Sequence, residues 1–208
     1  MITVYNYVLD TLSDWELGYV TAELNSGQYF KKQSDSVSVK TVCSTEECII
    51  TKGGMTVKPD ITVDEIIIDS SALLLLPGAD TWDDSIHIPI IEKATELLVC
   101  GAAVAAICGA TTALAGVELL DKWVHTSNSL EYLKMVCPSY KGEPYYRDVK
   151  AIKDGNLITA SSAGGLLFAK LIIEDLEVFS KDTLEAWYNY FDKGDATYFY
   201  DLMQTLED

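Results

Sequence analysis

Residues 104–112 read VAAICGATT, and this stretch decides the fold. An apolar run ends at Cys108, small residues follow it, and a helical pattern starts at Thr111 and continues to Leu120. A change from strand to helix within a few residues is typical of α/β proteins, in which buried strands alternate with helices. The sequence therefore predicts a strand over 102–107, a turn of small residues over 108–110 and a helix over 111–120.

The same alternation continues in both directions from this stretch. The run Leu73–Leu76 favours a central strand that is buried on both faces, as in parallel sheets. Ser13 or Asp14 is suited to cap the first helix, which we expect to end at Gly27. The other predicted strands are 2–9, 36–42, 55–57, 149–152 and 156–159, and the other predicted helices are 15–24, 85–98, 163–176, 182–191 and 195–206.

This order of elements predicts a three-layer αβα sandwich with a mostly parallel, doubly wound, flavodoxin-like sheet and right-handed crossovers. Ligands gather at the carboxyl ends of the central strands in such sheets. We expect a single domain over 1–208, with 178–208 as a C-terminal helical extension.

Composition excludes several classes of protein. The 208 residues are 49% hydrophobic, which is enough for a sizeable core and excludes general disorder. The net charge of −17 disfavours binding to nucleic acid or to a membrane surface. No apolar run reaches the roughly 20 residues that a membrane span needs, and residues 1–8 do not have the pattern of a signal peptide. Five cysteines are an odd, sparse set, so we expect reduced thiols and a cytoplasmic protein.

Cys108 is the residue at which reactive chemistry is most expected. A nucleophile on a tight strand-to-helix turn needs small neighbours, and Ala106, Gly109 and Ala110 supply them. The N-terminus of the following helix would favour a thiolate. The alternative is that Cys108 is a small buried hydrophobe, and the residues alone leave both interpretations open.

Two further segments reach the same edge of the predicted sheet. Gly78 and Ala79 follow the central strand, and their N–H groups are placed to bind an oxyanion, although an ordinary turn would have the same sequence. Glu16 lies just after the first strand, in the first turn of the predicted helix. Its carboxylate either only interacts favourably with the helix dipole or also approaches Cys108. A buried, protonated Glu16 would donate a hydrogen bond to a thiolate and lower the pKa of the cysteine.

Five segments, taken together, resemble the DJ-one/ThiJ/PfpI superfamily, which shares its fold with the class I glutamine amidotransferases. In chain order they are residues 7–16, 75–82, 105–111, 125–128 and 154–160. The nearest similarity is to a bacterial subgroup of amidase-like and intracellular protease-like proteins. The resemblance implies that Cys108 is the elbow nucleophile, that Glu16 is its acidic partner and that the amides of Gly78, Ala79 and Gly109 bind an oxyanion. It also implies a homodimer.

The third catalytic partner is where the sequence departs from the family. Many members have a histidine after the elbow helix, and the local candidate is His125, either as a catalytic residue or as a solvated loop histidine. The family's histidine commonly lies slightly later, where this chain has Ser127 and Asn128. Residues 159–162 lack the His and Glu pair of true amidotransferases, so a full glutamine-hydrolysing triad is not expected.

No cofactor and no metal are expected. Cys43 and Cys48 do not have zinc-knuckle spacing, and they are either a structural pair or two free thiols. Three function classes remain. One is an enzyme whose Cys108 thiolate attacks an amide, an ester or a reactive aldehyde. The second is a redox-responsive stress protein whose Cys108 is oxidised to sulfinate. The third is a structural relative without reactive chemistry.

Overall fold

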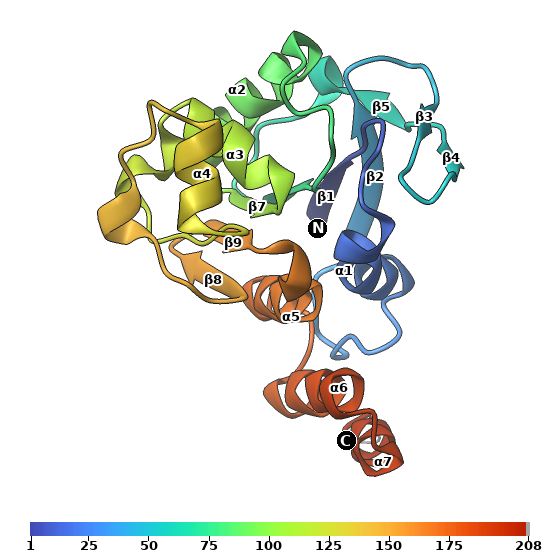
Figure 1. Cartoon of the computed structure of the whole chain (residues 1–208). Helices are drawn as coiled ribbons and strands as arrows, with labels where there is room; N and C mark the ends of the chain where they lie inside the picture. The colour runs from blue at the N-terminus through green and yellow to red at the C-terminus, as the bar shows by residue number, and fades with distance from the viewer. Residues whose placement is uncertain (207–208) are drawn as a thin grey trace.

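A seven-stranded sheet forms the centre of the structure, a computed structural model that describes residues 1–206 (Figure 1). The strand order is β5–β2–β1–β6–β7–β9–β8. The bounds are β1 (Ile2–Tyr7), β2 (Val37–Cys43), β5 (Ile61–Thr62), β6 (Ala72–Leu76), β7 (Ala103–Ile107), β8 (Ala151–Asp154) and β9 (Leu157–Ala160).

The strands pair in parallel, apart from β8, which runs antiparallel to β9. Every residue of β6 and of β7 is buried, which explains why both segments are apolar without alternation. The parallel register of β1, β6 and β7 brings their carboxyl ends to one edge of the sheet. The predicted α/β sandwich with a mostly parallel sheet is confirmed.

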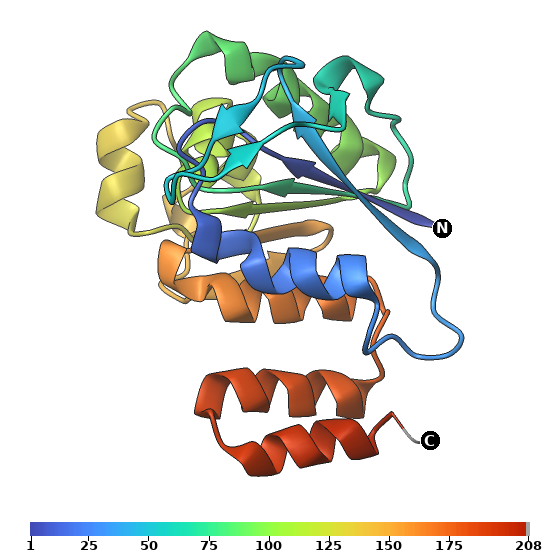
Figure 2. The same ribbon diagram turned by 90° about the vertical axis from the view of Figure 1, so that its right-hand side faces the viewer.

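Helices cover both faces of the sheet (Figures 1 and 2). Helices α2 (Ile88–Cys100), α3 (Gly109–Gly116) and α4 (Leu130–Val136) lie on one face, and α1 (Asp14–Ser26) and α5 (Gly165–Asp175) on the other. Alternate residues of β1 serve the two cores, since Val4 packs toward α1 and Tyr5 packs toward α2. Short 3-10 turns lie at residues 63–65, 85–87, 119–122, 143–145 and 162–164.

The C-terminal helices α6 (Lys181–Lys193) and α7 (Ala196–Gln204) form a further layer beyond α1 and α5 (Figure 2). The indole N–H of Trp187 on α6 donates to Oε1 of Glu23 on α1 over 3.0 Å, and both side chains are buried. The helical extension expected at 178–208 therefore packs on α1, and its positions 207 and 208 lie outside the described residues. Within residues 1–206, each helix is too short or too polar to reach across a lipid bilayer.

A small hairpin was only half predicted. Strands β3 (Ile49–Ile50) and β4 (Thr56–Val57) pair antiparallel, whereas the sequence predicts only a strand at 55–57. The hairpin turn lies beside the loop between β1 and α1, because the N–H of Lys52 donates to Leu12 O over 2.9 Å and the N–H of Gly53 donates to Asp14 Oδ2 over 2.6 Å. These bonds place the hairpin at the carboxyl edge of the sheet.

Candidate active site

Cys108 lies between β7 and α3, in the backbone conformation of a strained elbow. Its φ of 56° and ψ of −123° fall in a region that L-residues rarely adopt. The Cys108 N–H donates to Ala160 O of the neighbouring strand β9 over 3.0 Å. Helix α3 begins at Gly109, two residues earlier than the sequence predicts, so the turn is tighter than expected. A strained backbone of this kind is a feature of functional sites and presents the side chain outward.

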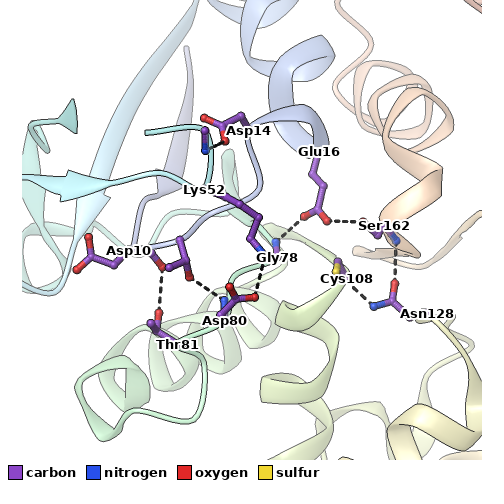
Figure 3. A network of polar contacts seen from close by, with 12 residues as sticks. Asp10, Asp14, Glu16, Lys52, Gly78, Asp80, Thr81, Cys108, Asn128 and Ser162 are labelled. Carbon is purple, nitrogen blue, oxygen red and sulfur yellow. Dashed lines mark hydrogen bonds and ion pairs between the residues drawn. The ribbon is translucent and has the colours of Figure 1, made fainter. Parts of the chain in front are cut away.

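Glu16 is fully buried in the first turn of α1 and lies against Cys108 (Figure 3). Its carboxylate accepts the Gly78 N–H at 2.7 Å and the Ser162 hydroxyl at 2.8 Å. It is also close enough to Cys108 for each group to shift the pKa of the other. Gly78 is required by this close approach, because a Cβ there would lie 2.5 Å from Glu16 Oε2 and 2.7 Å from Cys108 Cβ.

Asn128 holds the sulfur from the other side (Figure 3). Its Nδ2 donates to Cys108 Sγ over 3.3 Å, and its Oδ1 accepts the Ser162 N–H at 2.9 Å. The second bond fixes which way the amide points, so the donor group faces the sulfur. Ser162 therefore supports both partners of Cys108, through its hydroxyl to Glu16 and through its N–H to Asn128.

Burial raises the pKa of both Glu16 and Cys108. The ionised Glu16 raises the pKa of the Cys108 thiol further, while the Asn128 amide lowers it. The hydrogen bonds from Ser162 and Gly78 favour the carboxylate form of Glu16. The pKa of Cys108 therefore lies above that of an ordinary thiol, opposite to the expected lowering, because desolvation and the Glu16 charge outweigh the donors around the sulfur.

The expected oxyanion donors divide into two groups. The Gly78 N–H is bonded to Glu16, so the expectation that it binds an oxyanion is wrong. Among residues 1–206, no acceptor takes the N–H of Ala79, and Gly109, as the first residue of α3, has no acceptor within its own helix. The two backbones are adjacent, since a Cβ on Gly109 would lie 3.4 Å from Ala79 N. Ala79 has a negative φ, so alanine is suited to this turn.

His125 is not brought to Cys108. It is fully buried, and both ring nitrogens are occupied: Nδ1 donates to Trp123 O at 2.6 Å and Nε2 accepts the Tyr140 hydroxyl at 2.7 Å. Burial lowers its pKa and keeps the ring neutral. It is therefore neither a solvated loop histidine nor a contact of the sulfur, and Asn128 occupies the place expected for it.

Lys52 is a site residue that the sequence did not reveal. Its ammonium group donates to Asp80 Oδ1 over 2.8 Å, just outside Glu16 and Cys108 (Figure 3). The Asp80 N–H donates in turn to Thr11 Oγ1 over 2.8 Å. The hydrogen bond to Asp80 is the main cause of the raised pKa of Lys52, and Glu16 and Cys108 add smaller contributions. The sequence gives no sign that Lys52, next to Gly53 and Gly54, lies near Cys108. Its position depends on how the β3–β4 hairpin folds back onto the loop between β1 and α1.

The remaining cysteines are free, with Cys43 buried and Cys48 exposed. Among residues 1–206, no three or more His, Cys, Asp or Glu side chains are grouped so as to hold a metal ion.

Comparison of the sequence with models of known protein families identifies one that matches this chain. The model of the DJ-1/PfpI family matches residues 2–175, which is most of the chain. The chain belongs to the DJ-1/PfpI family. The resemblance inferred from the five segments is thereby confirmed.

Individual DJ-1/PfpI proteins are similar over nearly the full length. An uncharacterized protease, YoaZ, from Bacillus subtilis is 48% identical over 98% of this chain and 97% of its own. A thiJ/pfpI family protein from Bacillus anthracis superposes with a TM-score of 0.97 at 48% identity, covering 100% of this chain and 99% of that one. A DJ-1 superfamily protein from Agrobacterium tumefaciens superposes with a TM-score of 0.80 at 26% identity, covering 93% of this chain and 99% of that one. The homodimer and the cytoplasmic location stay predictions.

Proposed function

We propose that this DJ-1/PfpI protein is a cysteine-dependent enzyme that attacks small electrophilic carbonyl compounds, with amide or ester hydrolysis as its main reaction. The observation that carries the proposal is the close approach of the buried Glu16 carboxylate to Cys108 at a strained elbow, where a single Cβ on Gly78 would meet both side chains at 2.5 Å and 2.7 Å. A nucleophile in contact with a base is the arrangement that covalent catalysis needs.

The proposed reaction depends on the transfer of the Cys108 proton to Glu16. Cys108 Sγ attacks the carbonyl carbon while its proton passes to Glu16, whose raised pKa makes it a better base than an ordinary carboxylate. The carbonyl oxygen becomes an oxyanion, and collapse of this intermediate expels the alcohol or amine, which takes the proton from Glu16. Water then attacks the thioester, gives its proton to Glu16 and releases the acid, and the proton returns to Cys108.

The surrounding groups have separate tasks. The N–H groups of Ala79 and Gly109 would donate to the oxyanion, where preorganised donors contribute most to the rate. Asn128 would hold the sulfur in the orientation for attack and stabilise its charge. Gly78 positions Glu16 rather than touching substrate.

The relatives support hydrolysis over other reactions. Two similar Bacillus subtilis proteins, 48% and 31% identical, are named as uncharacterized proteases. A reactive aldehyde is the other substrate class that fits, because a hemithioacetal forms by the same attack and the same proton transfer.

Oxidation sensing is less well supported. Peroxide reacts with the thiolate, so a sensor cysteine has a low pKa. The pKa of Cys108 is raised by burial and by Glu16, which favours a thiol that is deprotonated only as it attacks.

The test compares wild type with Cys108→Ala on three substrates: a p-nitrophenyl ester, a short peptide anilide and a 2-oxoaldehyde. We expect turnover of at least one, lost in the variant, and a burst of p-nitrophenol from acylation of Cys108. If all three remain untouched while dilute peroxide converts Cys108 to sulfinate, the sensor function is correct and the enzyme is not.

A further inference from the structure

A hollow of about 500 Å³ lies between α2 and α3, away from the Cys108 thiol. Its walls are mostly apolar, and they are formed by Trp82, Ile88, Ile91, Ala113, Val117 and Val136. Ile88, Val117 and Val136 are about half exposed, so the hollow is open to solvent. Its size is within the range of small-molecule sites, in which an apolar wall surrounds a few polar groups.

His87 is one of the polar residues that line this hollow, and it is 6% exposed. Its Nδ1 lies 2.6 Å from the Tyr7 hydroxyl, which lies 2.6 Å from Ser44 Oγ, and Ser44 donates to Ile86 O at 2.9 Å. Each hydroxyl has a single proton. Because Ser44 gives its proton to Ile86, Tyr7 must donate to Ser44 and His87 Nδ1–H must donate to Tyr7. The chain of bonds fixes the tautomer and leaves Nε2 as an acceptor.

The Nε2 atom of His87 has no hydrogen-bond partner among residues 1–206. His87 lines both this hollow and a smaller one of about 220 Å³ that Ser44 also lines. Its Nδ1 is bonded through Tyr7 to Ser44 on the side of the smaller hollow, so we assign the free Nε2 to the larger one. Nε2 is not among the sealed side-chain atoms without a partner, so a donor on a ligand would take the place of water there. The ring stays neutral and able to accept, because burial lowers its pKa despite the nearby carboxylates of Asp84, Asp10 and Asp83.

The rim adds negative charge. Asp83, Asp84 and Glu92 line the hollow, and the described residues that line it include no Lys or Arg. An apolar wall, a nitrogen acceptor without a protein partner and acidic groups together match a molecule with an apolar body and one positively charged N–H donor.

We propose that the hollow between α2 and α3 is a second binding site, which takes primary ammonium compounds with a small aryl or alkyl body. The ammonium group donates to His87 Nε2 and lies near the rim carboxylates, while the body packs on Ile91, Ala113 and Trp82. Trp82 also lies 3.3 Å from where a Cβ on Gly109 would be, so the site shares a wall with the elbow. The proposal does not depend on the reaction at Cys108.

Calorimetric titration of the full chain tests this site with 2-phenylethylamine and with 2-phenylethanol, which has the same body and no charge. Gly116→Leu would place an apolar side chain in the hollow, from a position where nothing lies within 4 Å of a Cβ. His87→Phe keeps the ring and removes the acceptor. Gly18→Leu is the matched control: it makes the same change at an exposed, equally open position of α1.

We expect the amine to bind wild type, Cys108→Ala and Gly18→Leu equally, and to bind Gly116→Leu and His87→Phe at least roughly tenfold more weakly, as loss of one good hydrogen bond predicts. The alcohol should bind wild type more weakly than the amine does. Equal binding of the two probes would disprove recognition of charge. Binding to Gly116→Leu as tight as to wild type, or no binding to wild type at about 10 mM amine, would refute the site itself.

Discussion

The side-chain amide of Asn128 donates to Sγ of Cys108 over 3.3 Å, the contact that the sequence led us to expect from His125. The amide carries no titrating proton, so it cannot take the proton of the thiol. It lowers the pKa of the thiol by donating to the charged form. In the proposed mechanism, proton transfer is therefore assigned to Glu16.

Replacing Asn128 by Leu should raise the pKa of Cys108, because the donor that lowers it is lost. The rate of iodoacetamide labelling, followed against pH, should then rise at a higher pH than in wild type. Asn25→Leu makes the same change at an exposed position of α1 and should leave the profile unchanged. A profile that moves to lower pH would contradict the hydrogen bond.

Replacing Glu16 by Gln should separate labelling from turnover. The ionised carboxylate raises the pKa of Cys108, so its removal lowers that pKa and shifts iodoacetamide labelling to lower pH. Turnover should fall by about 10²–10⁴, the usual contribution of a general base. Glu23→Gln changes a buried glutamate of the same helix and should alter neither quantity. If labelling and turnover both increase, Glu16 does not act as a base.

The Glu16→Gln variant should also be more stable than wild type at neutral pH. Burial raises the folded-state pKa of Glu16 above its unfolded value, so ionisation is harder in the folded protein. Wild type therefore loses stability as the pH rises from the ordinary carboxyl range through that raised pKa, whereas Gln does not. We expect a gain in Tm at pH 7 that disappears in acid, measured by thermal melts across a pH series. A gain of equal size at every pH would show that ionisation is not the cause.

His125→Phe should affect folding and leave the thiol unchanged. The change removes hydrogen bonds to Trp123 O and the Tyr140 hydroxyl inside the core, and unpaired partners there cost about 1–3 kcal/mol. Urea unfolding should show that loss, while the labelling profile of Cys108 stays as in wild type. If the labelling profile shifts as much as it does in Asn128→Leu, His125 does influence the Cys108 thiol.

Gly78→Ala and Ala79→Gly should differ sharply despite being neighbours. A Cβ on Gly78 would meet Glu16 Oε2 at 2.5 Å and Cys108 Cβ at 2.7 Å, so one of these groups must move. Ester hydrolysis should be largely lost in Gly78→Ala. Ala79→Gly keeps its N–H and should retain most of the activity. Equal rates in the two variants would show that the spacing of Glu16 and Cys108 is unimportant.

The sequence predicts the central part of the fold and of the site for a clear physical reason. Strands β1, β6 and β7 are apolar enough to be recognised, and their parallel order alone brings Glu16, Gly78 and Cys108 to one edge. Elements with few local signals were missed, namely the two-residue strands β3 and β5 and the short helix α4.

The missed site residues come from segments whose paths depend on distant contacts. Lys52 arrives on a hairpin held by Leu12 and Asp14, and Ser162 follows the last strand of the parallel set. The pKa of Cys108 was mispredicted because spacing reveals the helix N-terminus after the cysteine but not how deeply the thiol is buried. His125 was misplaced because nothing local shows that Trp123 O and Tyr140 would occupy its nitrogens.

The positive φ of Cys108 has a consequence for how such a chain changes over generations. A side chain held at φ 56° costs about 1–3 kcal/mol, and a glycine at the same place would avoid most of that cost. A laboratory population selected for heat resistance alone would be expected to acquire the substitution Cys108→Gly and lose its sulfur. Persistence of cysteine at this bend under that pressure would mean that the cell requires the thiol.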